Sequence, residues 1–195
     1  MSAQPHFNLT PEEYLELERK AEFKSEYSDG HVYVMTGASW NHIQIVANLI
    51  TTLTPPLRAR GCTALPNEMK VWIAARRKFY YPDVTMVCGR PQFYDERQDV
   101  ITNPTLIIEV LSDSTAAYDR GDKFLAYQQL DSLRSYVLVS QHQPAVEQYV
   151  KLEDGAWQYM AHIGLESSLT LPSVDCSLAL SDVYADVEWE NEENI

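Results

Sequence analysis

Two short apolar stretches have the composition of buried strands. Residues 79–88 and 106–112 are rich in valine, isoleucine and aromatic residues, and turn-forming residues border each stretch. Each stretch nevertheless carries one carboxylate, Asp83 in the first and Glu109 in the second. Side chains alternate between the two faces of a strand, so Glu109 shares a face with the apolar residues two positions before and after it. Both acids are therefore expected to lie away from free water.

The rest of the chain predicts alternating helices and strands. Apolar residues at helical spacing predict helices over residues 11–24, 40–54, 114–130 and 178–187, and short apolar runs predict strands over residues 31–35, 68–73, 135–139, 146–150, 156–160 and 169–171. Thr10 and Ser39 are suited to cap the first two helices. We expect Ile43 on the buried face of the second helix, which Pro55 and Pro56 should end.

The connections predict how the strands pair. The basic run Arg76-Arg77-Lys78 lies in the turn between strands 68–73 and 79–88, which predicts a hairpin, and Glu153-Asp154-Gly155 predicts a second hairpin near the C-terminus. The strand, helix and strand over residues 106–139 predict a right-handed parallel crossover.

The expected fold class is α/β, with a mixed sheet flanked by helices in the order α-β-β-β-α-β and an extra C-terminal hairpin. We expect a single domain over residues 1–195, with a core at about residues 10–187, a short N-terminal extension and an acidic C-terminal tail.

Composition narrows the class of protein. The 195 residues are 45% apolar, enough for one full core. Cys62, Cys88 and Cys176 lie far apart without paired spacing, which argues against a disulfide framework or a zinc site and favours a reducing cytosol. The start has no signal-like pattern, and no apolar run is long enough to cross a membrane, so we expect a soluble cytoplasmic protein.

The net charge of −13 counts against a protein that coats nucleic acid, because phosphate contacts come from lysine and arginine. An enzyme needs only a local basic surface, so this charge does not count against an enzyme that acts on nucleic acid.

The two carboxylates predict a metal site. Two buried acids on neighbouring strands repel each other unless donors or a cation compensate them. Mg²⁺ prefers oxygen ligands and binds through one or two protein carboxylates while keeping waters. The alternative is that Asp83 is a turn residue after Pro82, and that Glu109 faces solvent.

Lys123 is the third candidate. It lies fourteen residues after Glu109 and about two turns into the predicted helix, so its long side chain could reach the carboxylates. An ammonium there could polarise a water or stabilise charge growing on a phosphate. The alternative is a surface lysine whose stem packs on the sheet.

The combined pattern of residues resembles a known family. Its pieces are Thr10-Pro11-Glu12-Glu13-Tyr14, Glu26-Tyr27 before Asp29-Gly30, His42, Tyr81-Pro82-Asp83-Val84, Ile108-Glu109-Val110-Leu111-Ser112, Asp122-Lys123 with Tyr127, and Tyr136-Val137-Leu138-Val139. Over residues 10–187 it resembles the Uma-type group within the PD-(D/E)xK nuclease superfamily, which has the restriction-endonuclease-like fold. This group is a domain of unknown function expanded in cyanobacteria and labelled "putative restriction endonuclease".

The resemblance implies a metal-dependent phosphodiesterase. Asp83, Glu109 and the backbone carbonyl of Val110 would hold Mg²⁺, with Mn²⁺ as a substitute. The superfamily pattern places its lysine where this chain has Leu111, and the family's lysine would instead be Lys123.

Two further residues have implied roles. Glu26 would be an additional acidic ligand, directly or through water, and His42 would approach the scissile phosphate. The alternatives are a solvated glutamate and a hydrogen-bonded packing histidine.

These residues lead to the hypothesis of a Mg²⁺-dependent endonuclease acting on DNA. The best basic candidates for DNA contact are Lys70, Arg76, Arg77 and Lys78, although a solvated hairpin tip explains them equally well. Many nucleases of this architecture cut both strands as dimers, so we also expect a homodimer. The alternatives are a nuclease fold that has lost catalysis and binds nucleic acid, and a protein-interaction module.

Overall fold

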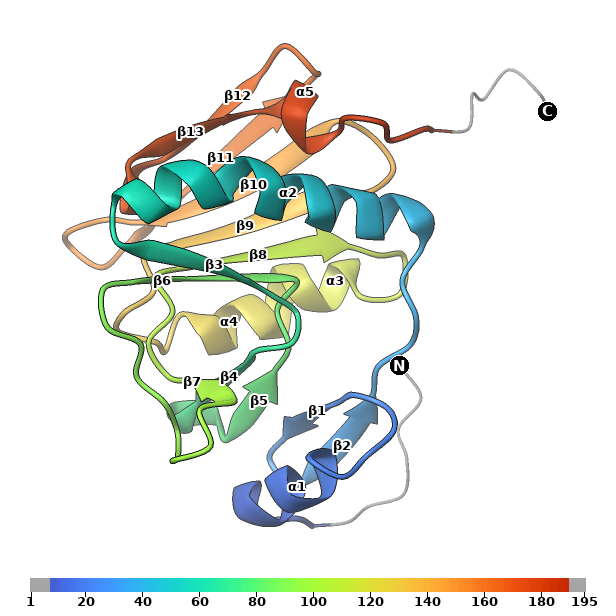
Figure 1. Ribbon diagram of the computed structural model, residues 1–195, viewed down its shortest axis with the longest axis vertical. Helices are drawn as coiled ribbons and strands as arrows, with labels where there is room; N and C mark the ends of the chain where they lie inside the picture. The colour runs from blue at the N-terminus through green and yellow to red at the C-terminus, as the bar shows by residue number, and fades with distance from the viewer. Residues whose placement is uncertain (1–7, 190–195) are drawn as a thin grey trace.

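A six-stranded mixed sheet forms the centre of the molecule (Figure 1). The computed structural model describes residues 8–189. The strand order across this sheet is β11 (Trp157–Ile163), β10 (Ala145–Lys151), β9 (Ser135–Ser140), β8 (Leu106–Leu111), β6 (Val84–Cys88) and β3 (Cys62–Pro66). Within this sheet β8 and β9 pair in parallel, as predicted, and the other neighbouring strands pair antiparallel. Strands β10 and β11 form the predicted hairpin.

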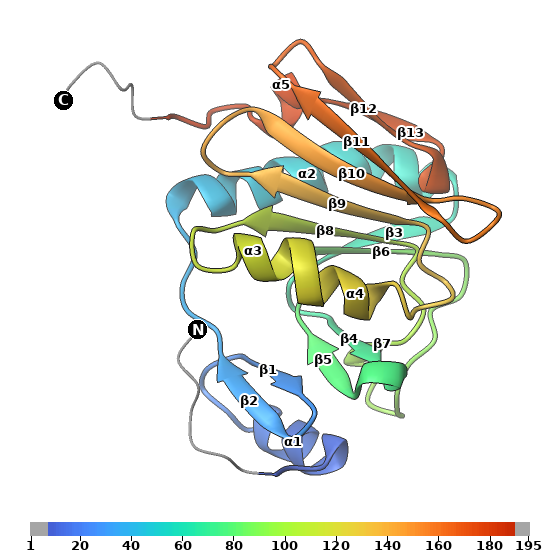
Figure 2. The same cartoon turned by 180° about the vertical axis from the view of Figure 1, so that it is seen from behind.

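Helices cover both faces of this sheet (Figures 1 and 2). The long helix α2 (Trp40–Ala59) packs Ile45, Leu49 and Leu57 against one face. The other face is covered by a helical segment made of α3 (Ala116–Tyr118), a π-helical turn (Asp119–Lys123) and α4 (Phe124–Tyr127).

A second sheet has five strands, in the order β2 (His31–Val34), β1 (Ser25–Ser28), β5 (Lys78–Tyr80), β4 (Lys70–Ile73) and β7 (Val100–Ile101). It carries helix α1 (Pro11–Glu18) at the end of the molecule opposite the C-terminal strands (Figure 1). Tyr14, Tyr27 and Phe79 stack into the small core beneath α1. Thr10 caps α1 in a capping box with Glu13, as its sequence predicts.

The single strand expected over residues 79–88 is wrong. The chain forms β5 in one sheet and β6 in the other, and residues 81–83 connect them. Pro82 has no N–H to donate to a ladder, so the strand breaks there. The hairpin that carries Arg76 and Arg77 therefore joins β4 to β5, and Asp83 lies at the junction of the two sheets.

Helix α2 differs from expectation in two ways. It continues through Pro55 and Pro56 to Ala59, because the buried Leu53 and Leu57 continue its apolar face. Ile43 is 54% exposed, since the buried row begins at Ile45 instead.

The expectation that the cysteines are unpaired is wrong for two of them. Cys62 and Cys88 form a disulfide. Strand β3, which the pattern did not predict, pairs antiparallel with β6 and sets Cys62 opposite Cys88. This removes the argument for a reducing cytosol that was drawn from their spacing.

The C-terminal part ends in a two-stranded sheet, β12 (Ser168–Leu171) with β13 (Cys176–Ala179), followed by the short helix α5 (Leu180–Val183). The helix expected from residue 178 therefore starts later, because residues 176–179 pair as a strand. Within residues 8–189, no helix combines the length and apolar character that crossing a membrane requires. The expected extension and acidic tail fall largely on residues 1–7 and 190–195, outside the described residues.

A charged network ties α1 to the β7 end of the second sheet. Arg19, which follows α1, donates two hydrogen bonds to the Asp99 carboxylate at 2.6 and 2.9 Å and one to Asp95 at 2.7 Å. The Lys70 ammonium lies 3.3 Å from Asp99 Oδ2. Hydrogen bonds from Arg19, with the charge of Lys70, lower the pKa of Asp99 to about 2.

We therefore expect Asp99→Asn to cost stability in a pH-dependent way. The pKa of Asp99 is depressed on folding, so its contribution is present above the ordinary value of 3.8 and lost as the pH falls towards 2. Urea unfolding should show a loss of about 1 kcal/mol at pH 7, after allowance for partial solvent screening, and almost none near pH 2. Glu96→Gln, in the same loop, is the control, and an equal loss at both pH values would contradict this account.

Candidate active site

The site lies where strand β6 parts from β8. The β6–β8 pairing ends at Val84 opposite Ile108, because Pro82 and Asp83 turn away toward the other sheet. The Val110 N–H instead donates to Asp83 Oδ2 at 2.7 Å, and the Asp83 N–H points at Glu109 Oε2 at 3.4 Å. The strand break therefore brings the two predicted carboxylates side by side.

Glu109 projects from β8 toward the helical segment and is only 3% exposed. Its Oε1 accepts a hydrogen bond from the Tyr127 hydroxyl at 3.0 Å and lies 2.8 Å from the Lys123 ammonium. Burial raises the pKa of Glu109 well above its ordinary value, and the nearby charge of Asp83 adds to this, while Lys123 opposes it.

Lys123 comes from the π-helical turn and is buried among carboxylates. Its Nζ lies 2.8 Å from Glu109, 3.5 Å from Asp119 and 3.6 Å from Glu26. Burial by itself would lower the pKa of this lysine, but the three carboxylates together hold it well above its ordinary value. Lys123 is therefore a fixed positive charge in the centre of the cluster.

Glu26 reaches the same cluster from strand β1 of the other sheet. Its Oε1 accepts the Tyr81 N–H at 3.0 Å, so it also holds the connection that leads to Asp83. Burial raises the pKa of Glu26, while the charge of Lys123 lowers it in part. Glu26 thus links both sheets through one carboxylate.

His42 approaches from the opposite side, on the first turn of α2. Ser39 caps this helix and accepts the His42 backbone N–H. The His42 ring nitrogen Nε2 lies 3.0 Å from Asp83 Oδ1 and can donate to it. The contact recorded for His42 is therefore with Asp83, which fits a residue that orients this carboxylate.

All five side chains expected at the site thus converge on one place, the junction between the two sheets. Sequence reasoning missed Asp119, which is 3% exposed and pairs with Lys123, and gave Tyr127 no role. Asp119 lies four residues before Lys123, a spacing that puts two helical residues on one face and could have indicated the pair. The π-helical turn has no comparable sequence signal.

The four basic residues predicted to touch DNA differ in their exposure. Lys70 is 5% exposed and its ammonium contacts Asp99 and the Tyr81 hydroxyl, so the prediction that it reaches DNA is wrong. Arg76 and Arg77 are exposed in the β4–β5 turn, where Arg77 pairs with Asp29. Lys78 is half-buried beside Tyr80.

The charges of the buried cluster do not balance. Three carboxylates, Glu26, Glu109 and Asp119, pair with the ammonium of Lys123, and a fourth, Asp83, adjoins Glu109. All four are at most 8% exposed. Such an excess of negative charge must be neutralised by protons or by a cation. Burial raises the pKa of both Glu26 and Glu109, so the charged forms of these two acids are disfavoured in the cluster.

The donor set fits a hard cation. Mg²⁺ is usually held by one or two carboxylates together with waters and substrate phosphates. Asp83 and Glu109 lie side by side, and Glu109 Oε2 is engaged only by the long contact from the Asp83 N–H. Among residues 8–189, no three His, Cys, Asp or Glu side chains form a group that could hold a metal by themselves.

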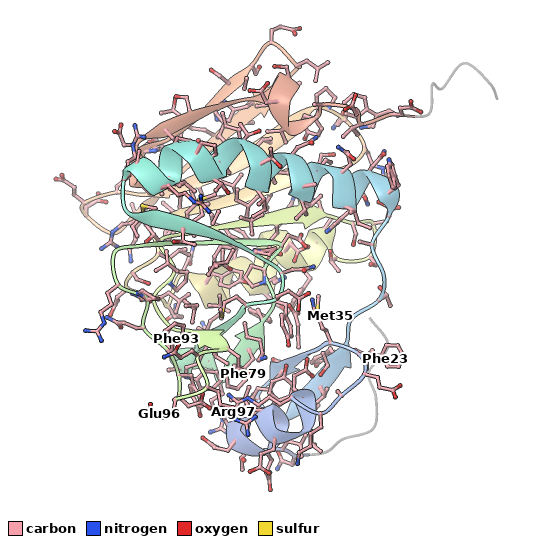
Figure 3. All side chains as sticks on the ribbon, in the orientation of Figure 1. Phe23, Met35, Phe79, Phe93, Glu96 and Arg97 are labelled. Atoms are coloured by element: carbon pink, nitrogen blue, oxygen red, sulfur yellow. A yellow bond between two sulfur atoms is a disulfide. The ribbon has the colours of Figure 1, made fainter. Side chains whose placement is uncertain are left out.

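A surface hollow of about 500 Å³ lies elsewhere, in the loop before β7, and is lined by Arg90, Pro91, Gln92, Phe93, Tyr94, Asp95, Glu96 and Gln98. Figure 3 labels Phe93 and Glu96 of this loop, which lie near the end of the five-stranded sheet. None of the carboxylates around Lys123 lines this hollow, so its size does not mark the candidate site.

The fold is shared with a solved structure described as "a putative nuclease belonging to DUF820 from Anabaena variabilis ATCC 29413". The match covers 90% of this chain and 97% of that chain, with a TM-score of 0.74 and 17% sequence identity. The protein is therefore an α/β protein of the restriction-endonuclease-like fold class.

The chain belongs to the Uma2 family, described as "Putative restriction endonuclease", whose model matches residues 11–181. This confirms the resemblance inferred from the sequence. Two relatives come from Synechocystis sp. (strain ATCC 27184 / PCC 6803 / Kazusa). The uncharacterized protein sll1609 is 38% identical over 149 residues, or 76% of this chain and 84% of the relative. The uncharacterized protein slr1290 is 37% identical over 180 residues, or 92% and 93%.

We expect Lys123→Met to destabilise the metal-free protein by roughly 3 kcal/mol, because removing one partner of a buried ion pair leaves the other charges uncompensated. Urea unfolding with a chelator present measures this loss. Glu109→Gln in the same chain should restore part of the stability, since it removes one of the charges left unpaired. Lys20→Met, on the exposed surface, is the control. Unchanged stability in Lys123→Met would contradict the charge balance described here.

Proposed function

We propose that this protein is a metal-dependent endonuclease that hydrolyses phosphodiester bonds of DNA. The observation that carries the proposal is the meeting of Asp83 and Glu109 beside the buried ammonium of Lys123. Membership of a family described as "Putative restriction endonuclease" supports it, as does a shared fold with a protein described as "a putative nuclease".

In this proposal, Asp83 and Glu109 hold Mg²⁺, with the carbonyl of Val110 as a backbone ligand and Mn²⁺ as a substitute. When bound, the ion supplies Lewis acidity and lowers the pKa of a coordinated water. The Val110 N–H holds Asp83 in place through its 2.7 Å hydrogen bond to Oδ2, and His42 orients the same carboxylate from Oδ1. Asp83 is therefore fixed at both oxygens before a substrate arrives.

Lys123 provides the charge that the reaction needs. Negative charge spreads over the phosphoryl oxygens in the transition state, and a fixed cation in a site of low dielectric stabilises it there. Glu26 and Asp119 keep Lys123 charged and point it at Glu109. Glu26 thus acts as a positioning residue here, through the ammonium and through the Tyr81 N–H.

DNA reaches this site through a local basic surface, because the chain as a whole is acidic. Arg76 and Arg77, exposed in the β4–β5 turn, are the proposed contacts to the phosphate backbone. Two active sites, one from each copy of the chain, could cut both strands together, so a homodimer is part of the proposal.

A second candidate is a nuclease fold that has lost catalysis and acts by binding nucleic acid or a protein. It is favoured by the position of Lys123, which stands outside the usual superfamily spacing after Glu109. The two candidates differ in one respect that can be measured, the cleavage of DNA in the presence of a divalent ion.

The test is cleavage of supercoiled plasmid and of a labelled duplex with Mg²⁺ or Mn²⁺. Asp83→Asn and Glu109→Gln should abolish cleavage, and Lys123→Met should lower kcat by about 10²–10³, as does the loss of one preorganised charge-stabilising donor. Glu153→Gln, an exposed glutamate in the β10–β11 turn, is the matched control and should cleave as the wild type does.

Cleavage that survives Asp83→Asn would refute the proposed site. Absence of cleavage by the wild type with every divalent ion, in a protein that still binds DNA, would favour the second candidate.

A further inference from the structure

Three side chains on one side of the cluster form a group that we call the lysine–tyrosine rim: Lys78, Tyr80 and Tyr118. The Lys78 ammonium donates to the Tyr80 hydroxyl at 2.8 Å, and the hydroxyls of Tyr80 and Tyr118 lie 2.6 Å apart. Lys78 and Tyr118 are half-buried, whereas the neighbouring Tyr80 is buried. The rim therefore connects the buried cluster to the surface.

The ring of Tyr80 is the link to the proposed active site. The ammonium of Lys123 lies 5.4 Å from the ring centroid, and that of Lys78 lies at the same distance. Tyr80 also packs edge-on against Tyr127, whose hydroxyl donates to Glu109. Because each ammonium nitrogen lies 5.4 Å from the same ring centroid, the two are at most about 11 Å apart.

Lys78 differs from the other half-buried or buried cations near the site. Lys70 and Lys123 each contact carboxylates, but in the described part of the chain no carboxylate lies within 4.0 Å of Lys78. Burial lowers the pKa of Lys78, and the charge of Arg76 lowers it further, while Asp122 opposes this. A cation that is partly desolvated and has no carboxylate in ion-pair contact gains more from an incoming anion than a solvated one.

The hydrogen bonds of the rim leave a second donor for the same anion. The Tyr80 oxygen accepts from Lys78, and either of the two tyrosine hydroxyls can donate to the other. When Tyr80 is the donor, the Tyr118 O–H is available to a group outside the chain. Lys78 and Tyr118 together offer a charged donor and a hydroxyl donor, and phosphate oxygens accept readily from both.

We propose that Lys78, held by the Tyr80 hydroxyl and assisted by the Tyr118 hydroxyl, binds a backbone phosphate of the nucleic acid close to the phosphate that is cleaved. The proposal rests on the proposed function for the identity of the substrate. It assigns Lys78 to binding, at a position that the Tyr80 ring fixes relative to Lys123. Arg76, nearby in the β4–β5 turn, adds to the positive potential over this part of the surface.

The test is the salt dependence of DNA binding, measured with a fluorescently labelled duplex and full-length protein, with a chelator present so that no cleavage occurs. Lys78→Met should weaken binding by about five- to twentyfold at low salt, and should reduce the slope of log K against log salt by about 1, the loss of one phosphate contact. Tyr118→Phe should weaken binding less and leave the slope unchanged. Lys78→Arg should restore the wild-type slope.

Lys151→Met is the matched control, because Lys151 is also half-buried and lies at the end of β10. It should leave binding and slope as in the wild type. If Lys78 had only a structural role, Lys78→Met would change the urea midpoint and leave the slope of log K against log salt unchanged, and that result would overturn the inference. A wild-type protein that binds no duplex would overturn it as well.

The two proposals fail separately. A wild type that cleaves DNA while Lys78→Met keeps the full slope would overturn the phosphate contact alone. A Lys78-dependent slope in a protein that never cleaves would support the contact and overturn the nuclease.

Discussion

The junction between the two sheets is built around one buried ammonium group, that of Lys123. Lys123 is the only cation placed directly among Glu26, Glu109 and Asp119 in the described residues, and it holds together elements that come from both sheets and from the helical segment. Buried charge is costly unless it is paired, so the charged lysine stabilises the junction by compensating these acids. Asp83 adjoins the same group, and its Oδ1 lies 3.0 Å from His42 Nε2. One ammonium cannot neutralise four acids, and this shortfall suits the site to a divalent ion.

The fold brings these groups together because the hydrogen-bonded pairing of strands β6 and β8 ends beside them. Strands β6 and β8 pair regularly up to Val84. Past the end of this pairing, the backbone N–H of Val110 donates its hydrogen bond to the Asp83 carboxylate instead of to strand β6. The break at Pro82 therefore has two results. It sends the chain from one sheet to the other, and it turns a carboxylate toward Glu109. The π-helical turn also helps to build the site, since it buries the side chains of Asp119 and Lys123 there together.

Much of this was predictable from the sequence. The strand of Glu109, its parallel pairing with β9, the C-terminal hairpin and the capped helices follow from short-range patterns of apolar and turn-forming residues. What could not be predicted depends on long-range pairing. The Cys62–Cys88 disulfide needs the register of β3, and the burial of Lys70 needs Asp99 of a distant loop. Pro55 and Pro56 were expected to end a helix, but the packing of Leu57 outweighs the backbone hydrogen bonds that they remove.

The central claim is that Asp83 and Glu109 share one hard cation whose charge replaces protons in the cluster. It is tested most directly by isothermal titration of Mn²⁺ into the wild type and Asp83→Asn, repeated in buffers of different ionisation enthalpy. The account predicts one ion per chain in the wild type, a heat that varies with the buffer because protons are released on binding, and loss of that binding in Asp83→Asn. The absence of ion binding by the folded wild type, or binding that Asp83→Asn leaves unchanged, would contradict it.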